Sequence, residues 1–140
     1  MKKAIRWLRR LAVLVVVVGL YPLFVLGYTW YHVLRSDLEG GRHGPLDAYR
    51  HALASAVVSY TLDARAVTLV TAVFESRGKD SNRMDSHNNH IGARIGSAAA
   101  SLAELESAVR GRVLAGTVHS SAPDQITWLP RERWRDSRFW

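Results

Sequence analysis

The 140-residue sequence contains no cysteine, and this absence excludes several kinds of chemistry. Without cysteine there is no thiol nucleophile, no thiolate-bound zinc and no disulfide, although an exported domain of this size can fold without disulfides. An evenly basic surface is also missing. Residues 2–10 carry five of the 19 basic residues, whereas residues 35–127 hold ten basic and ten acidic ones. The net charge of +7 therefore does not indicate nucleic-acid binding.

Charged residues are absent between Arg10 and Arg35, and residues 11–31 are almost all aliphatic or aromatic. A bilayer core of ~30 Å requires ~20 apolar residues in a helix, so this stretch predicts one transmembrane helix. Pro22 is compatible with that interpretation because transmembrane helices tolerate proline. Aromatic residues flank the stretch, as is typical of membrane interfaces: Trp7, Tyr28, Trp30 and Tyr31.

The five basic residues before the apolar stretch predict an N-terminus in the cytoplasm and a domain outside it. We therefore expect a single-pass protein of the inner or plasma membrane. A cleaved signal peptide is the alternative, with residues 25–27 as a weak cleavage site. The apolar stretch is longer than the ~7–15 residues usual for a signal peptide, which favours an uncleaved anchor. Both alternatives export the domain.

The remainder of the chain predicts a mainly α-helical domain of about four helices. Residues 1–34 form the basic start and anchor, residues 35–43 a glycine-containing linker, residues 44–116 the domain and residues 117–140 a C-terminal tail. Helix start and stop signals place helices near residues 45–60, 64–76, from about 85, and 102–115. Ser101 and Glu104 have capping-box spacing, and residues 125–128 could form a short strand.

Two positions in the predicted helices carry candidate catalytic groups. Asp47 and His51 are four residues apart and share a helix face, so the carboxylate can orient the imidazole as a general base or metal ligand. The simpler interpretation is a helix-capping Asp and a structural His. Glu75 ends an apolar helix, where burial would favour its acidic form and a role as general acid. A solvent-facing Glu is the usual alternative.

A dense polar cluster follows at residues 84–92. It offers a carboxylate, an imidazole and two amides: Asp85, His87, Asn88 and Asn89. Part of the cluster could simply cap a helix. Together with the upstream positions it supplies candidate ligands for a divalent metal, namely His51, Glu75, Asp85 and His87, although no diagnostic metal-binding spacing is present. Gly92 and Gly96 are four residues apart and would allow another backbone to approach closely.

Three blocks together resemble a bacterial domain family of unknown function that is also found in secreted and toxin-like proteins. They are Gly-Pro-x-Asp-Ala-x-Arg-His-Ala at residues 44–52, Glu75, and Met-Asp-x-His-Asn-Asn-x-x-Gly-x-x-Ile-Gly at residues 84–96. The resemblance implies that one site contains Asp47, Arg50, His51, Glu75, Asp85, Asn88 and Asn89. The chain departs from the family at Phe74, where relatives tend to have His.

A looser similarity involves Glu75-Ser76 and the later Asn88-Asn89-x-x-Gly92. It is similar to peptidoglycan glucosaminidases and lytic transglycosylases, in which the Glu is the catalytic acid. An exported domain would meet that substrate. However, Arg77 replaces the usual Gly, and the block around His51 has no role in that mechanism.

The tail alternates aromatic and basic residues from Trp128 to Trp140. This pattern is compatible with binding to a membrane interface that contains anionic lipid and equally with packing on the domain.

Three functions remain open. The first is an exported hydrolase-like domain in which His51, Glu75 and Asp85 are catalytic. A divalent metal is its possible cofactor, and Asp47, Arg50, His87, Asn88 and Asn89 bind or orient a cell-envelope substrate. The second is the peptidoglycan-cleaving enzyme with Glu75 as acid. The third is a non-enzymatic envelope protein whose polar groups join the helices.

Overall fold

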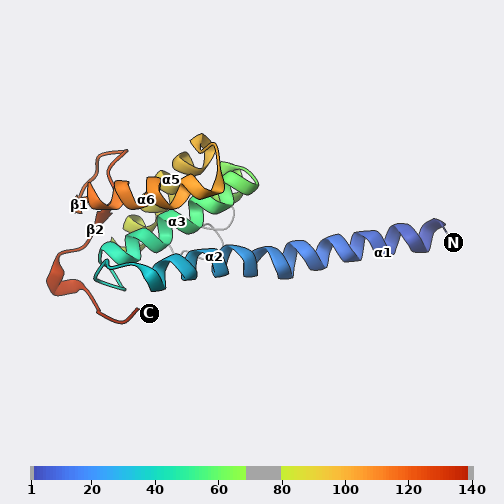
Figure 1. The fold of residues 1–140 in the computed structure, drawn as a ribbon, viewed down its shortest axis with the longest axis horizontal. Helices are drawn as coiled ribbons and strands as arrows, with labels where there is room; N and C mark the ends of the chain where they lie inside the picture. Colours follow the sequence, from blue (N-terminus) through green and yellow to red (C-terminus); the bar gives the residue numbers. More distant parts are fainter. Residues whose placement is uncertain (1, 69–79, 139–140) are drawn as a thin grey trace.

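A computed structural model describes residues 2–68 and 80–138 of the chain. The protein is mainly α-helical, as the sequence predicted, and a two-stranded parallel sheet lies at one end (Figure 1). In chain order the elements are α1 (Lys2–Val15), η1 (Val16–Leu20), α2 (Tyr21–Arg35), α3 (Pro45–Thr61), α5 (Asp80–Ala98), α6 (Leu102–Leu114), β1 (Thr117–Val118), β2 (Thr127–Trp128) and η2 (Arg131–Arg133).

The N-terminal elements form one continuous apolar helix, Lys3–Arg35, which by length and composition could cross a membrane. Its α1 end projects well beyond the other helices (Figure 1). The π-helical turn η1 lies directly before Pro22, at the second position of α2. Proline has no N–H, and its ring crowds the carbonyl four residues earlier, so a wider turn at this point relieves the conflict.

The second half of this helix belongs to the core of the domain. Val25, Thr29 and Val33 on α2 are buried, and α2 packs against α3. The Tyr21 and Thr61 hydroxyls form a hydrogen bond of 2.6 Å that joins the start of α2 to the end of α3. One face of α2 therefore packs on the domain, and the opposite face is exposed.

Residues 35–43, expected to be a linker, are instead held against the domain. Ser36, Gly40 and Gly41 are buried, and the Gly40 and Glu39 carbonyls accept hydrogen bonds from the first turn of α3. The two glycines made the segment resemble a flexible connection. In the structure they are needed because Trp134 and the Ser137 backbone lie where their side chains would be.

The helix α3 is the centre of the domain and is covered by α2, α5 and α6. It consists largely of small and aliphatic residues, most of which are buried. The prediction that Gly92 and Gly96 permit close backbone approach is confirmed. A Cβ atom at Gly92 would lie 2.1 Å from the Ala52 carbonyl oxygen, and one at Gly96 would lie 2.2 Å from the Ala56 carbonyl oxygen.

Helix ends agree with the sequence in part. Asp63 accepts a hydrogen bond from the Arg65 N–H (3.1 Å), as expected for a cap, and residues 64–68 are helical. The capping box is incomplete, because the Ser101 side chain makes no cap hydrogen bond and Glu104 accepts from the Ala100 N–H instead. The helix expected from about residue 85 begins earlier, at Asp80.

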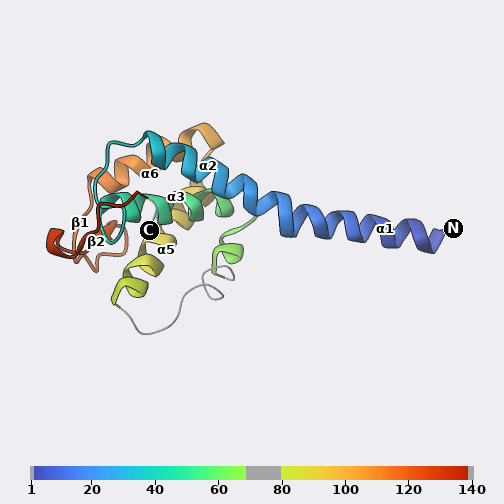
Figure 2. The same cartoon turned by 90° about the horizontal axis from the view of Figure 1, so that it is seen from below.

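The C-terminal tail packs on the domain along its described length. Ile126, Thr127 and Leu129 are buried, and a strand as predicted includes Thr127–Trp128. The tail also pairs with the loop before α3, because Arg42 and Arg135 exchange two backbone hydrogen bonds of 3.1 Å. It lies at the end of the domain opposite to α1 (Figures 1 and 2). Of the two interpretations of the tail, the packed one agrees with these contacts.

Candidate functional site

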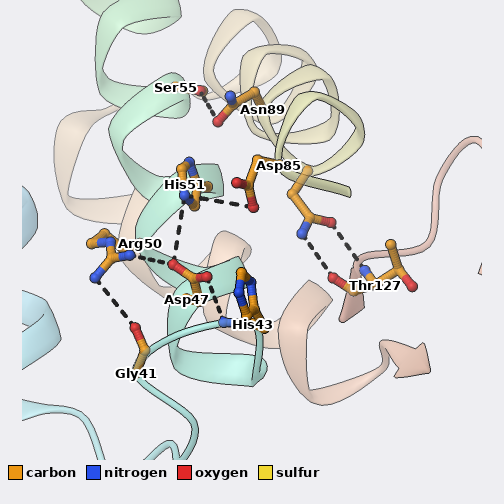
Figure 3. Close-up of polar contacts among 10 residues, drawn as sticks. Gly41, His43, Asp47, Arg50, His51, Ser55, Asp85, Asn89 and Thr127 are labelled. Carbon is orange, nitrogen blue, oxygen red and sulfur yellow. Dashed lines mark hydrogen bonds and ion pairs between the residues drawn. The ribbon is translucent and has the colours of Figure 1, made fainter. Parts of the chain in front are cut away.

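Three of the predicted side chains meet between α3 and α5 (Figure 3). The His51 Nε2 atom lies 3.5 Å from Asp47 Oδ1 and 3.6 Å from Asp85 Oδ1. One ligand atom from each of the three residues lies within 4.8 Å of the other two. Asp47 is almost fully buried, whereas His51 is about one-third exposed, with a side-chain accessibility of 31%. The cluster is therefore buried at Asp47 and accessible to solvent at His51.

Helix geometry explains why these residues meet. Asp47 and His51 are one turn apart on α3 and point in the same direction. On α5, Asp85 precedes Gly92 by two helical turns and so lies on the same face. Because Gly92 lets α5 approach the backbone of Ala52, which directly follows His51, Asp85 is brought to the imidazole.

Each carboxylate oxygen of the buried Asp47 has a polar partner. Its Oδ1 atom forms an ion pair with Arg50, and its Oδ2 atom accepts a 2.7 Å hydrogen bond from the His43 N–H (Figure 3). Arg50 also donates to the Gly41 carbonyl (3.4 Å), and its guanidinium lies 5.6 Å from the Trp30 ring centroid. These partners offset the cost of burying the Asp47 carboxylate and hold it in one orientation.

His43 is a neighbour of the site that the sequence did not single out. Burial lowers its pKa, while the nearby Asp47 carboxylate partly opposes this effect. Its backbone has a φ of 65°, in the left-handed region. Its Nδ1 atom is buried without a hydrogen-bond partner in the described part of the chain. The available signal was the position of His43 directly before Gly44-Pro45, where the chain turns into α3.

The other polar residues of α5 point to different partners. His87 Nε2 is 2.9 Å from the Gln125 carbonyl, on the tail. Asn88 is fully buried and makes two hydrogen bonds with the Thr127 backbone, of 2.7 and 3.0 Å. Asn89 accepts a 2.9 Å hydrogen bond from Ser55 on α3. In this arrangement all three residues contact the protein itself, and their proposed contact with substrate stays a prediction. Glu75 lies outside the described residues.

Three hollows lie near the domain surface, and none of their lining includes the three clustered residues. One of about 480 Å³ lies between α5 and α6 and includes Arg94, Glu104 and Asp124. Another of about 470 Å³ includes Arg65, Asn89 and His90. A third of about 490 Å³ includes Arg35, Asp37 and Arg110. These three hollows are therefore separate from the cluster of Asp47, His51 and Asp85.

The donor set of the cluster suits a divalent cation. One imidazole nitrogen and two carboxylate oxygens are ligands for zinc, manganese and iron. Ligands ~2.1 Å from a tetrahedral zinc are ~3.4 Å from one another, close to the two measured separations from His51. An ion bound by all three residues would share Asp47 Oδ1 with Arg50 or use the other carboxylate oxygen.

Comparisons with known proteins add no family to this description. No protein-family model, curated protein or solved structure matches the chain.

Proposed function

We propose that the protein is a membrane-anchored domain that binds a divalent cation through Asp47, His51 and Asp85 and acts as a hydrolase. The observation that carries this proposal is the position of His51 Nε2, 3.5 and 3.6 Å from two carboxylate oxygens on two different helices. Because no family model matches the chain, the proposal rests on this geometry and not on the resemblance of residues 44–52 and 84–96 to a domain family.

The residues of the cluster and those around it would have different roles in this function. Asp47, His51 and Asp85 would hold the ion, and a zinc ion with three protein ligands would supply a water nucleophile near neutral pH. Arg50 is partly exposed beside Asp47 and provides a positive charge for an anionic substrate group. The His43 N–H and the Arg50 guanidinium hold Asp47 in one orientation.

The same geometry supports one alternative, a structural network without metal. A protonated His51 between two carboxylates would also satisfy all three groups. The hydrogen bonds of Asn88 to Thr127 and of Ser55 to Asn89 favour this alternative, since they use α5 polar groups to join helices and tail.

Metal binding by the full chain in detergent separates the two. Zinc and manganese titrations followed by calorimetry should show one site per chain. Asp85→Asn and His51→Gln should weaken binding at least tenfold, because even residues behind the ligands contribute ~10–100-fold. Asp124→Asn is the control, because this carboxylate is exposed and is not one of the three clustered residues. An unmodified protein that binds neither metal, or variants that bind as tightly, would leave the structural network as the function.

The membrane anchoring rests on the exposure of the apolar helix. Many of its large apolar side chains are exposed, as Leu11, Val18 and Leu23 illustrate (43%, 67% and 65% exposed). A row of this kind is stable in lipid and not in water. The basic residues before it support a cytoplasmic N-terminus and an extracytoplasmic domain. Membrane fractionation and protease accessibility from the outer side test both statements.

A further inference from the structure

The apolar helix is long enough to cross a bilayer, but its free part is not. The uncharged stretch begins at Leu11, and the packing of α2 against α3 begins at Tyr21, whose hydroxyl bonds Thr61. The ten residues from Leu11 to Leu20 span about 15 Å at 1.5 Å per residue. This is about half of the ~30 Å hydrocarbon core.

Part of the missing length must therefore come from α2 beside the domain. If Arg9 and Arg10 extend their side chains toward the cytoplasmic surface, they allow about one more helical turn, ~5 Å, to enter. The remaining ~10 Å corresponds to about seven residues, from Tyr21 to Gly27. The outer boundary of the hydrocarbon then falls next to Tyr28, Trp30 and Tyr31, the residue types that favour this interface.

The part of the domain at this depth is the C-terminal end of α3. Helix α3 runs antiparallel to α2 and ends beside Tyr21, on the side from which α1 projects (Figure 1). Two large apolar residues are exposed there, Tyr60 (37%) and Leu62 (59%). Asp63 and Arg65 are also exposed and follow directly. Because Thr61 is bonded to Tyr21, this end of α3 lies ~10 Å below a boundary at Tyr28, so the two charged side chains must reach upward or thin the lipid around them to stay hydrated.

We infer that this end of the domain is seated in the outer leaflet of the bilayer, with Tyr60 and Leu62 among the acyl chains and the Arg65 side chain extended toward the lipid phosphates. The inference rests on the proposed membrane anchoring and is independent of the metal site. In this arrangement the domain is held at a fixed distance from the membrane and is not on a flexible linker, because α2 is packed into the core through Val25 and Val33.

The seating also fixes where the cluster lies. His51 precedes Thr61 by ten residues on α3, which places it about 15 Å along the helix from the membrane end. The tail lies still farther away, at the opposite end of the domain (Figures 1 and 2). Since Thr61 lies ~10 Å below the outer boundary, the site would lie ~5 Å above it, at the level of the headgroups, and the aromatic and basic tail would lie beyond them.

The absence of cysteine makes a direct test possible in the full chain. Single cysteines at Leu62, Val118 and Val18, all exposed apolar positions, can carry an environment-sensitive fluorophore. The labelled proteins are reconstituted into vesicles of phosphatidylcholine and phosphatidylglycerol containing nitroxide-labelled lipids. We expect strong quenching of Val18→Cys by deep nitroxides, quenching of Leu62→Cys by nitroxides of intermediate depth in the acyl layer, and solvent-like emission from Val118→Cys.

Each other result contradicts the inference in a distinct way. Quenching at Val18 with none at Leu62 would mean that the domain stands clear of the bilayer. Equal quenching at Leu62 and Val118 would mean that the domain lies on its side. No quenching at Val18 would overturn the membrane anchoring itself. Circular dichroism of each labelled protein verifies that the helices are retained.

Discussion

His51 on α3 and Asp85 on α5 lie 3.6 Å apart, between their Nε2 and Oδ1 atoms, across the most extensive contact between described helices. The contact depends on Gly92, since a Cβ atom there would be 2.1 Å from the Ala52 carbonyl oxygen. The candidate site and the core thus both depend on the packing of α5 against α3. Any change that separates the two helices should affect both stability and the site.

Gly92→Ala should destabilise the protein even though alanine is the better helix former. The added methyl group must push α5 away from the backbone of α3, and overpacking of this kind typically costs ~1–3 kcal/mol. Gly111→Ala on α6 is the matched control, because no described atom lies within 4 Å of its Cβ position. It should instead stabilise the helix by up to ~1 kcal/mol. Urea unfolding of both variants measures the difference, and equal effects would contradict this account of the contact.

The features that the sequence predicted correctly depend on residues close together in the chain. The apolar helix, the start of α3 at Pro45 and the glycine contact follow from composition and helical spacing, and the structure confirms them. The pairing of Asp47 with His51 follows from the same spacing. These features depend only on residues a few positions apart, which is why sequence alone is sufficient.

Longer-range relationships could not be obtained in this way. Nothing in the spacing of Asn88 indicates that its amide binds the backbone of Thr127, because the tail returns to α5 only through tertiary packing. The role of Gly40 and Gly41 as space for Trp134 and the tail backbone was hidden for the same reason, and a linker was predicted. His43 was overlooked because its contact with Asp47 is made by its backbone N–H, which every residue type except proline offers.

Asn88→Ala should loosen the tail and destabilise the fold. The variant leaves the N–H and C=O of Thr127 buried without their present partners, and each such loss costs ~1–3 kcal/mol. We expect a lower free energy of unfolding and faster proteolysis after Thr117. His90→Ala, an exposed change two residues away, should alter neither measurement. An Asn88→Ala protein as stable as the unmodified one would favour a role for Asn88 in binding substrate.

Trp134→Ala should weaken metal binding without touching a ligand. The Trp134 ring packs against Gly40 and Gly44, on either side of the turn whose His43 N–H holds Asp47. Its loss should free that turn and reduce affinity ~10-fold, the lower end of the range for groups that orient ligands. Trp128→Ala is the control, because this ring contacts Gly116 instead. Both variants should lose stability, so only the metal titration distinguishes them. Equal affinities would show that the tail does not position Asp47.

His43→Asn should reduce the loss of stability in mild acid. Burial holds the pKa of His43 below its usual range in the folded protein, so the unfolded chain takes up the proton first. This contribution to stability is complete above pH ~6.5 and is lost as the pH falls toward the folded-state pKa. Asparagine suits the left-handed φ of 65° and does not titrate in this range. The control is His119→Asn, an exposed histidine with a similar φ of 53°. Urea unfolding of metal-free protein between pH ~5 and ~7 should give a shallower dependence for His43→Asn alone; matching slopes in all three proteins would contradict the burial of a neutral imidazole at this position.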